Sequence, residues 1–283
     1  MRTNIVYHDN CNDGAACAMI AVHALGPGPG INCIPAKYGE PFDLDELRNS
    51  RVFILDFSFD RETLLALSEE CQLIVLDHHE TAQMHLAGIP GCIYEPDKCG
   101  ARMTWEHFYG DTLPIPWWIE YIEDRDLWRW KLPYSKAVNA AIRSYGVSLV
   151  GLREALLWES GEAHREINAL SRDGMAILRN NDNVVGSHIE NAERVTMFGH
   201  EVLAVNATVL QSEIAGALSE AVPWNDETPP FGACWSERAD GARFWSLRSS
   251  KGGVNVAELA KSAGGGGHAA AAGFRQAPGK PLP

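Results

Sequence analysis

Three apolar segments near the start of the sequence end in side chains that can bind metal ions. The first ends at His8 with Asp13 shortly after it, the second at Asp56, and the third at the run Asp77–His79. Carboxylate and imidazole groups together suit Mn²⁺, Mg²⁺ or a similar divalent ion. Two such ions could polarise a phosphoryl oxygen and generate a hydroxide nucleophile. A single Asp after a strand is usually a turn or cap residue. The metal hypothesis therefore rests on the fact that three separate segments all end in residues that can bind metal ions.

A second candidate site lies in the sequence GGGGHAAAAGF near the C-terminus. Its four glycines, Gly264–Gly267, let backbone N–H groups approach an anion closely, and His268 adds a ring donor. Arg248 could bind phosphate through its guanidinium, and Ser249 could donate a hydrogen bond. The alternative is a flexible linker, the usual meaning of a glycine run. The apolar residues that follow the run argue against a linker.

The nine Trp residues are a further candidate for ligand contacts. Core or domain-interface packing is the expected role of most of them, because Trp buries a large apolar surface. Trp245 lies close to Arg248 in the sequence, and it is therefore the candidate for stacking on a base.

The candidate residues need secondary-structure elements that bring them together. Apolar runs of strand length lie at residues 4–8, 31–38, 51–57 and 72–80, and helical stretches separate them at residues 13–25 and 61–70. Nearly continuous apolar strands separated by helices predict a parallel sheet that is covered on both faces. Because the carboxyl ends of such strands line one crevice, the Asp and His side chains are expected to converge there.

The rest of the chain predicts a connector and a second domain. Helices are expected at residues 100–108 and 116–128, and residues 147–193 are charged, weakly periodic and typical of connecting helices. Hairpins are expected at 194–207 and 231–250, with helices at 212–221, capped by Ser212, and at 255–263. The sequence thus predicts an α/β protein with an N-terminal parallel-sheet domain (1–146), a helical connector (147–193) and a smaller mixed α/β domain (194–283).

Composition excludes several classes of protein. The chain of 283 residues has 24 Lys and Arg against 37 Asp and Glu, a net charge of −13. Residues 243–283 carry +5, so the remainder carries −18. This acid excess argues against long duplex nucleic acid as a partner, but it allows a small phosphorylated substrate held by metal ions. No apolar run approaches the roughly 20 residues that span a bilayer, and no signal peptide is recognised, so a cytoplasmic protein without a membrane partner is expected. The seven Cys residues, irregularly spaced, predict free thiols.

The motifs, taken together, resemble those of the DHH phosphoesterase superfamily. The segment LDHHE carries the Asp-His-His signature, YHDNCNDGAACA occupies the place of the first motif, ILDFS the second and IEDRDLW the fourth. GGGGHAAAAGF is similar to the GGGH motif of the DHH-associated substrate-binding domain, as in oligoribonuclease-like and RecJ-like phosphohydrolases. The motifs occur in the family's order and span residues 7–274.

The resemblance implies roles for individual residues. His8 or Asp9, with Asp13, would provide ligands from the first motif, and Asp56 would bridge two metals. His78 would be a further ligand oriented by Asp77. His79 would face the phosphate as a proton donor or electrostatic contact, so Asp77, His78 and His79 form the expected catalytic group.

Two positions leave these roles open. Asp124 is the expected ligand from the fourth motif, with Asp126 as its competitor in the same hexapeptide. Cys11 stands where members of the family usually have Asp, and a thiolate is a softer ligand than a carboxylate. The number of ions is therefore left at one or two, with Mn²⁺ expected and Mg²⁺ or Co²⁺ as alternatives.

The resemblance also implies an activity. The expected enzyme is a metal-dependent phosphoesterase that hydrolyses phosphate ester bonds of short oligonucleotides or small nucleotide phosphates through a metal-activated water. Its active site would lie in the cleft between the domains, and the C-terminal domain would hold the substrate through Arg248, Ser249, Gly265, Gly266, Gly267 and His268. The alternatives are an inorganic pyrophosphatase or polyphosphatase, a single-strand exonuclease of the RecJ type, and a non-catalytic nucleotide-binding module. The oligomeric state is left open, a homodimer included.

Overall fold

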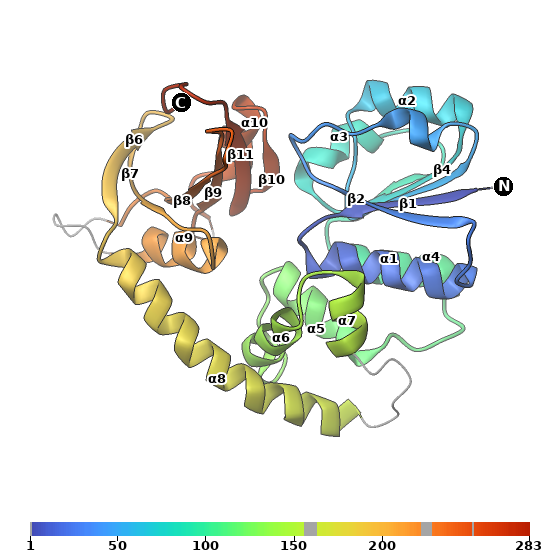
Figure 1. Ribbon diagram of the computed structural model, residues 1–283, viewed down its shortest axis with the longest axis horizontal. Helices are drawn as coiled ribbons and strands as arrows, with labels where there is room; N and C mark the ends of the chain where they lie inside the picture. Colours follow the sequence, from blue (N-terminus) through green and yellow to red (C-terminus); the bar gives the residue numbers. More distant parts are fainter. Residues whose placement is uncertain (1, 156–162, 222–227, 251) are drawn as a thin grey trace. The chain divides into compact units, whose positions relative to one another are not determined.

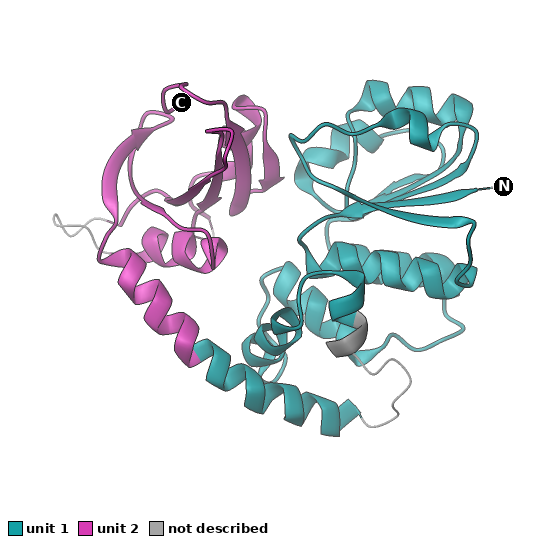
Figure 2. Ribbon diagram, viewed as in Figure 1, with its two compact units in different colours: residues 1–178 teal, residues 179–283 magenta. Residues whose placement is uncertain are grey.

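The computed structural model describes residues 2–155, 163–221, 228–250 and 252–283, which form two compact units. Unit 1 comprises Met1–Leu178 and unit 2 Arg179–Pro283 (Figure 2). The division falls inside helix α8 (Ala163–Ile189), within the connector expected from the sequence. The domain boundaries expected after residues 146 and 193 stay predictions.

Unit 1 contains a five-stranded parallel sheet with the strand order β2-β1-β3-β4-β5 (Figure 1). Its strands are β1 (Thr3–His8), β2 (Ile31–Ala36), β3 (Arg51–Leu55), β4 (Gln72–Asp77) and β5 (Cys92–Tyr94). Its helices are α1 (Asn12–Leu25), α2 (Arg61–Glu70), α3 (Gln83–Leu86), α4 (Gly100–Tyr109), α5 (Trp117–Asp126), α6 (Ser135–Ser144), α7 (Leu149–Ala155) and most of α8, with short 3₁₀ turns at Leu44–Leu47 and Glu80–Ala82.

The apolar strands of this sheet are buried on both faces. Ile5 packs against α1 and α4 on one face, whereas its neighbour Val6 packs on the other face, where α2 and α3 lie (Figure 1). Successive side chains of a strand point to opposite faces, which is why an uninterrupted apolar run is needed here. The parallel sheet predicted from the sequence is confirmed, with β5 as an additional edge strand of three residues.

Unit 2 contains a six-stranded mixed sheet with the order β10-β11-β9-β8-β7-β6, in which only the β7–β8 pair is parallel. Its elements are β6 (Glu193–Met197), β7 (His200–Asn206), α9 (Gln211–Glu220), β8 (Gly232–Glu237), β9 (Arg243–Arg248), α10 (Val256–Ser262), β10 (Gly266–His268) and β11 (Ala271–Gln276). Helix α9 packs with Cys234 in one core, and α10 packs with Leu247 in the other. The mixed α/β unit agrees with the prediction.

The structure decides three local questions in the second half of the chain. The prediction of Ser212 as the N-cap of α9 was wrong, because Leu210 holds that position and the Ser212 hydroxyl, in the first turn, accepts a hydrogen bond from Arg248. The glycine run is not a linker, because Gly266 and Gly267 pair with β11 in strand β10. The stacking role considered for Trp245 was also wrong. Its side chain is only 4% exposed and its indole N–H donates to Gln276, so it is a core residue.

All seven cysteines are free, as the sequence predicted. Among the described residues, no helix is long and apolar enough to cross a bilayer.

Candidate metal centre

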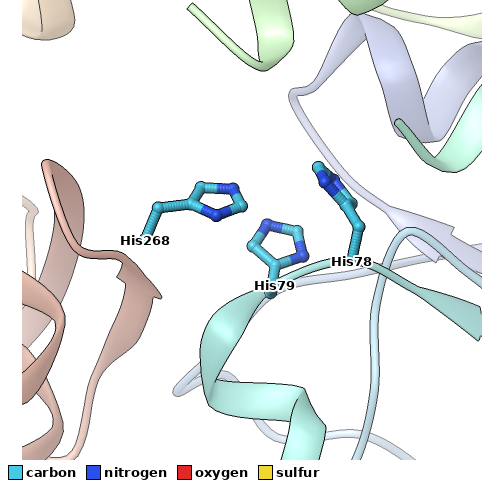
Figure 3. A group of neighbouring side chains, drawn as sticks. All are labelled: His78, His79 and His268. Carbon is cyan, nitrogen blue, oxygen red and sulfur yellow. The ribbon is translucent and has the colours of Figure 1, made fainter. Parts of the chain in front are cut away.

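The carboxyl ends of β1, β3 and β4 lie next to one another in the sheet, and each carries a predicted site residue. His8 is the last residue of β1, Asp56 follows β3, and Asp77 ends β4 with His78 and His79 directly after it. Figure 3 shows the rings of His78 and His79, whose centroids are 4.8 Å apart. The convergence expected from the parallel sheet is therefore present in unit 1.

Asp56 lies at the centre of this group. Its Oδ1 is 3.0 Å from His78 Nε2 and 3.9 Å from His79 Nδ1, and its Oδ2 is 3.6 Å from His8 Nδ1. The side chain is 1% exposed, which by itself raises the pKa of Asp56. The hydrogen bond from His78 and the nearby imidazoles of His8 and His79 outweigh burial and hold the pKa well below its usual value. Asp56 also has a left-handed φ of 55°, a conformation that Asp tolerates better than most residues.

Asp13 approaches the same group from the first turn of α1. Its carboxylate accepts hydrogen bonds from the backbone N–H of Gly100 (2.6 Å) and Ala101 (2.8 Å) at the start of α4. Its Oδ2 is 3.7 Å from His78 Nε2. Burial, with the charges of Asp56 and Asp126 added to it, raises the pKa of Asp13 well above its usual value. Three carboxylates therefore share one buried region.

Asp126, the last residue of α5, completes the cluster. Its Oδ2 is 3.3 Å from His78 Nε2 and is buried, with no hydrogen-bond partner among the described residues. Asp124 is engaged elsewhere, because its carboxylate accepts hydrogen bonds from the backbone N–H of Lys131 (2.8 Å) and Leu132 (3.2 Å). Of the two aspartates left open by the sequence, Asp126 is thus the one beside the histidines.

Asp77 organises the turn that carries the two histidines. Its Oδ1 accepts hydrogen bonds from the backbone N–H of His78 (2.7 Å) and His79 (3.0 Å) and lies 2.7 Å from His79 Nδ1. The sequence-based role for Asp77 was the orientation of His78. In the structure Asp77 forms hydrogen bonds with the ring and the backbone N–H of His79 and with the backbone N–H of His78. The Tyr38 hydroxyl donates to Asp77 Oδ2 at 3.3 Å, a contact that no sequence pattern indicated.

The remaining residues of the first motif lie at the edge of the cluster. Asp9 forms an ion pair with Lys37 at 2.8 Å, and it is absent from the groups of potential ligands found among the described residues. Cys11 is the N-cap residue of α1, and its pKa is raised well above the usual value by burial and by the charges of Asp56, Asp126 and Asp13. Its thiol is therefore held in the neutral form while the carboxylates carry charge.

The close approach of α4 to the cluster depends on Gly100. A Cβ atom at this position would lie 2.7 Å from the Cβ of Asp56 and 3.0 Å from Asp13 Oδ2. Sequence reasoning overlooked Gly100, although it begins the predicted helix directly after Cys99. Glycine is required because the side chains of Asp13 and Asp56 both approach the backbone of α4 at this position.

The side chains of this region fit a divalent cation. Two groups, His8 with Asp56 and His79, and Asp13 with His78 and Asp126, each place their ligand atoms within 4.8 Å of one another. In the described part of the chain, every ion pair that involves Asp13, Asp56 or Asp126 is with a histidine. Asp56 Oδ2 and Asp126 Oδ2 are buried with no hydrogen-bond partner among these residues. Buried acceptors that repel one another and lack donors are the arrangement that a bound cation would satisfy.

The predicted substrate-binding residues of unit 2 gather at one end of its sheet. Ala271 of β11 pairs with Arg248 of β9 on one side and with His268 of β10 on the other. Ser249 follows Arg248, and its hydroxyl is 3.5 Å from the Ala269 carbonyl. Gly265 precedes β10, and Gly266 and Gly267 belong to it. The sheet therefore brings these residues together within unit 2, and the expected cleft between domains stays a prediction. His268, the third ring in Figure 3, comes from this strand.

No protein-family model matches the chain. Over 290 residues the chain is 27% identical to an uncharacterized protein of Acanthamoeba polyphaga mimivirus. The match covers 95% of this chain and 66% of the viral protein, so the chain spans just under two thirds of that relative's length.

Three solved structures are similar in fold. The DHH domain of a member of a family of ribosomal proteins has a TM-score of 0.54 and 12% identity, covering 96% of this chain and 82% of that one. Exonuclease RecJ bound to manganese has a TM-score of 0.50 and 17% identity, covering 96% and 85%. RecJ of Thermus thermophilus in complex with Mn²⁺ has a TM-score of 0.50 and 14% identity, covering 96% and 49%. The chain has the fold of these DHH-domain proteins, which confirms the fold predicted from the motifs.

Proposed function

We propose that the protein is a divalent-metal-dependent phosphoesterase that hydrolyses phosphate ester bonds of short oligonucleotides or small nucleotide phosphates. The observation that carries this proposal is the cluster of three carboxylates, two of them fully buried, and three histidines beside the carboxyl ends of neighbouring parallel strands. The DHH fold, shared with a RecJ exonuclease that binds manganese, supports it.

Within this proposal, His8, Asp13, Asp56, His78 and Asp126 hold the metal. Asp126 replaces Asp124 in this set because only its carboxylate lies beside His78. A divalent ion held there supplies Lewis acidity toward a phosphoryl oxygen and a hydroxide nucleophile at neutral pH. Mn²⁺ is the expected ion, with one or two bound.

The chain's own residues complete the chemistry. Asp77 fixes the ring of His79 through Nδ1, so Nε2 is the atom that would exchange a proton with the leaving oxygen or stabilise charge on the phosphate. In unit 2, Arg248 and His268 would bind the substrate's phosphate, with the glycines of β10 allowing close approach. The role of His79 in unit 1 and the role of Arg248 and His268 in unit 2 both depend on positive charge or N–H donors. Arg and His side chains provide these groups.

A matrix of metals against substrates tests the proposal. Mn²⁺, Mg²⁺, Co²⁺ and Zn²⁺ are each combined with a dinucleotide, a nucleoside 3′,5′-bisphosphate, pyrophosphate and a single-stranded oligomer. We expect hydrolysis of the dinucleotide or bisphosphate with Mn²⁺. Phosphate release from pyrophosphate alone would contradict the proposal, and so would preferred degradation of the long single strand with steep salt dependence.

A further inference from the structure

The segment that follows α5, residues 127–132, is held largely by one residue. The carbonyl oxygen of Asp124 accepts hydrogen bonds from the N–H of Arg129 (2.8 Å) and Trp130 (3.2 Å), and its carboxylate accepts from Lys131 and Leu132. Asp124 itself is 4% exposed. Four consecutive backbone donors thus point at one buried residue, which makes the segment rigid.

The backbone of this rigid segment is strained at two bulky residues. Trp128 and Trp130 have φ values of 53° and 52°, in the left-handed region that large side chains rarely adopt. Such conformations persist only where the surroundings over-determine them, and they occur preferentially at functional sites. The hydrogen bonds to Asp124 supply that constraint here.

The constraint leaves a large aromatic side chain in solvent. Trp128 is 56% exposed, although burial of an indole is strongly favourable. Its ring is supported edge-on by Trp130, with centroids 5.0 Å apart and planes at 73°, and the Lys136 ammonium lies 5.6 Å from the Trp130 ring. The segment therefore presents a flat aromatic face that its own packing does not use.

This face lies close to the candidate metal centre along the chain. Trp128 is two residues after Asp126, so their Cα atoms are at most about 7.6 Å apart. A substrate phosphate bound at the candidate metal centre would therefore bring its nucleoside into the neighbourhood of this segment. A polyphosphate has no group that would use an aromatic face at this position.

We propose that Trp128 is a stacking surface for a nucleobase of the substrate, and that the strained segment pinned by Asp124 exists to hold it there. The inference rests on the proposed function for the identity of the substrate's phosphate ester. It goes further in assigning base recognition to unit 1 and in predicting weaker binding of substrates without a base.

The test compares two variants of Trp128 with a control. Trp128→Gly removes the ring and relieves the strain, whereas Trp128→Phe keeps an aromatic face. Tyr145→Ala is the matched control, because Tyr145 is 47% exposed in the same unit with an ordinary φ of −78°. Binding of a dinucleotide with a non-hydrolysable methylenephosphonate linkage is measured by calorimetry in EDTA and in Mn²⁺. KM is measured separately for a dinucleotide and for its abasic analogue.

We expect Trp128→Gly to weaken dinucleotide binding by about 5- to 150-fold, the range measured for one base–aromatic stack. Its melting temperature should be unchanged or higher, because Gly accepts a positive φ. Trp128→Phe should retain most of the affinity, Tyr145→Ala all of it, and the abasic substrate should show the same KM in every variant. Equal dinucleotide affinity of wild type and Trp128→Gly, or no binding by wild type in either condition, would overturn the inference. Binding that depends on Trp128 in a protein without hydrolytic activity would instead overturn only the proposed function.

Discussion

Asp56 contacts more of the histidines than any other carboxylate of the candidate metal centre. Its two oxygens face His8, His78 and His79, and its own backbone is left-handed at φ 55°. An Asp that ended a strand only as a turn residue would not need three imidazole neighbours. The residue that the sequence singled out by position is therefore also the residue with the most contacts to the other candidate ligands.

The two aspartates of α5 should separate in their effects. Asp126→Asn removes a charge that repels Asp13 and Asp56, so the metal-free fold should be retained or stabilised while the Mn²⁺-induced rise in melting temperature is lost. Asp124→Asn should lower the free energy of unfolding by about 1.5–3 kcal/mol through weakened charge-assisted hydrogen bonds. Thermal melts with and without Mn²⁺ measure both. If only Asp124→Asn lost the Mn²⁺-induced rise in melting temperature, Asp124 and not Asp126 would be the metal ligand.

Substitution of Asp9 provides a control at the same scale. Asp9 pairs with Lys37 and is a third exposed, so Asp9→Asn should change stability by less than about 1 kcal/mol. Its Mn²⁺ affinity, measured by calorimetry, should equal that of wild type. A large loss of Mn²⁺ affinity would place Asp9 among the ligands, as the resemblance of the first motif implies.

At the scale of elements, the site depends on how closely α4 approaches β3. The first turn of α4 supplies two N–H donors to Asp13, and Gly100 leaves room for both Asp13 and Asp56. The positive end of a helix is a favourable place for a carboxylate. Helix α4 thus positions one candidate ligand without contributing a ligand itself.

A pair of glycine substitutions tests this close approach. Gly100→Ala should destabilise the protein by about 1–3 kcal/mol, because its Cβ would overlap Asp56, and it should weaken Mn²⁺ binding. Gly186→Ala, in the last turn of α8 with open space around it, should stabilise by up to about 1 kcal/mol. Denaturant titrations compare the two. Equal effects of both substitutions would show that helix propensity, and not the approach of α4, decides.

At the scale of the whole molecule, the acid excess has a local counterpart. The net charge of −13 includes carboxylates that lie together in the candidate metal centre. Protons or divalent cations are the two species that can offset these charges. The stability of the protein should therefore depend on pH and on metal in a linked way.

Without metal, the protein should lose stability as the pH rises above neutrality. Burial lowers the pKa of His78, but its hydrogen bond to Asp56 and the neighbouring carboxylates outweigh burial and raise the pKa well above 6.5. The contribution of His78 is therefore complete below pH 6.5 and is lost as the pH rises through its folded pKa. Because the folded pKa of Asp13 is raised, the stability that Asp13 contributes is also lost as the pH rises above its ordinary pKa of 3.8. The folded pKa of Asp56 is lowered, so the stability that Asp56 contributes is present above pH 3.8 and is lost in acid.

Melting temperatures measured in EDTA between about pH 6 and pH 9 check this dependence. We expect a decline with pH in EDTA and a smaller decline, or none, with excess Mn²⁺, because the cation replaces the protons. A melting temperature in EDTA that rises over this range would contradict the charge balance described for the cluster.

The apolar pattern of the sequence was sufficient to predict the parallel sheet, and the residues that end its strands were sufficient to predict that His8, Asp56 and the run Asp77–His79 converge. Burial on both faces demands uninterrupted apolar strands, and parallel strands present their carboxyl ends at one edge. These consequences follow from local pattern and topology alone.

Tertiary structure decided what the pattern left open. Residues two apart on a helix point about 200° away from each other, so only the packing of α5 determines that Asp126 faces His78 while Asp124 holds the next segment. Similarly, nothing in the sequence around Trp245 or Trp128 distinguishes a buried indole from an exposed one. The first is enclosed by the strands of unit 2, and the second is held in solvent by a left-handed backbone that hydrogen bonds to the buried Asp124 maintain. Side-chain direction depends on contacts between elements, and those contacts exist only once the chain has folded.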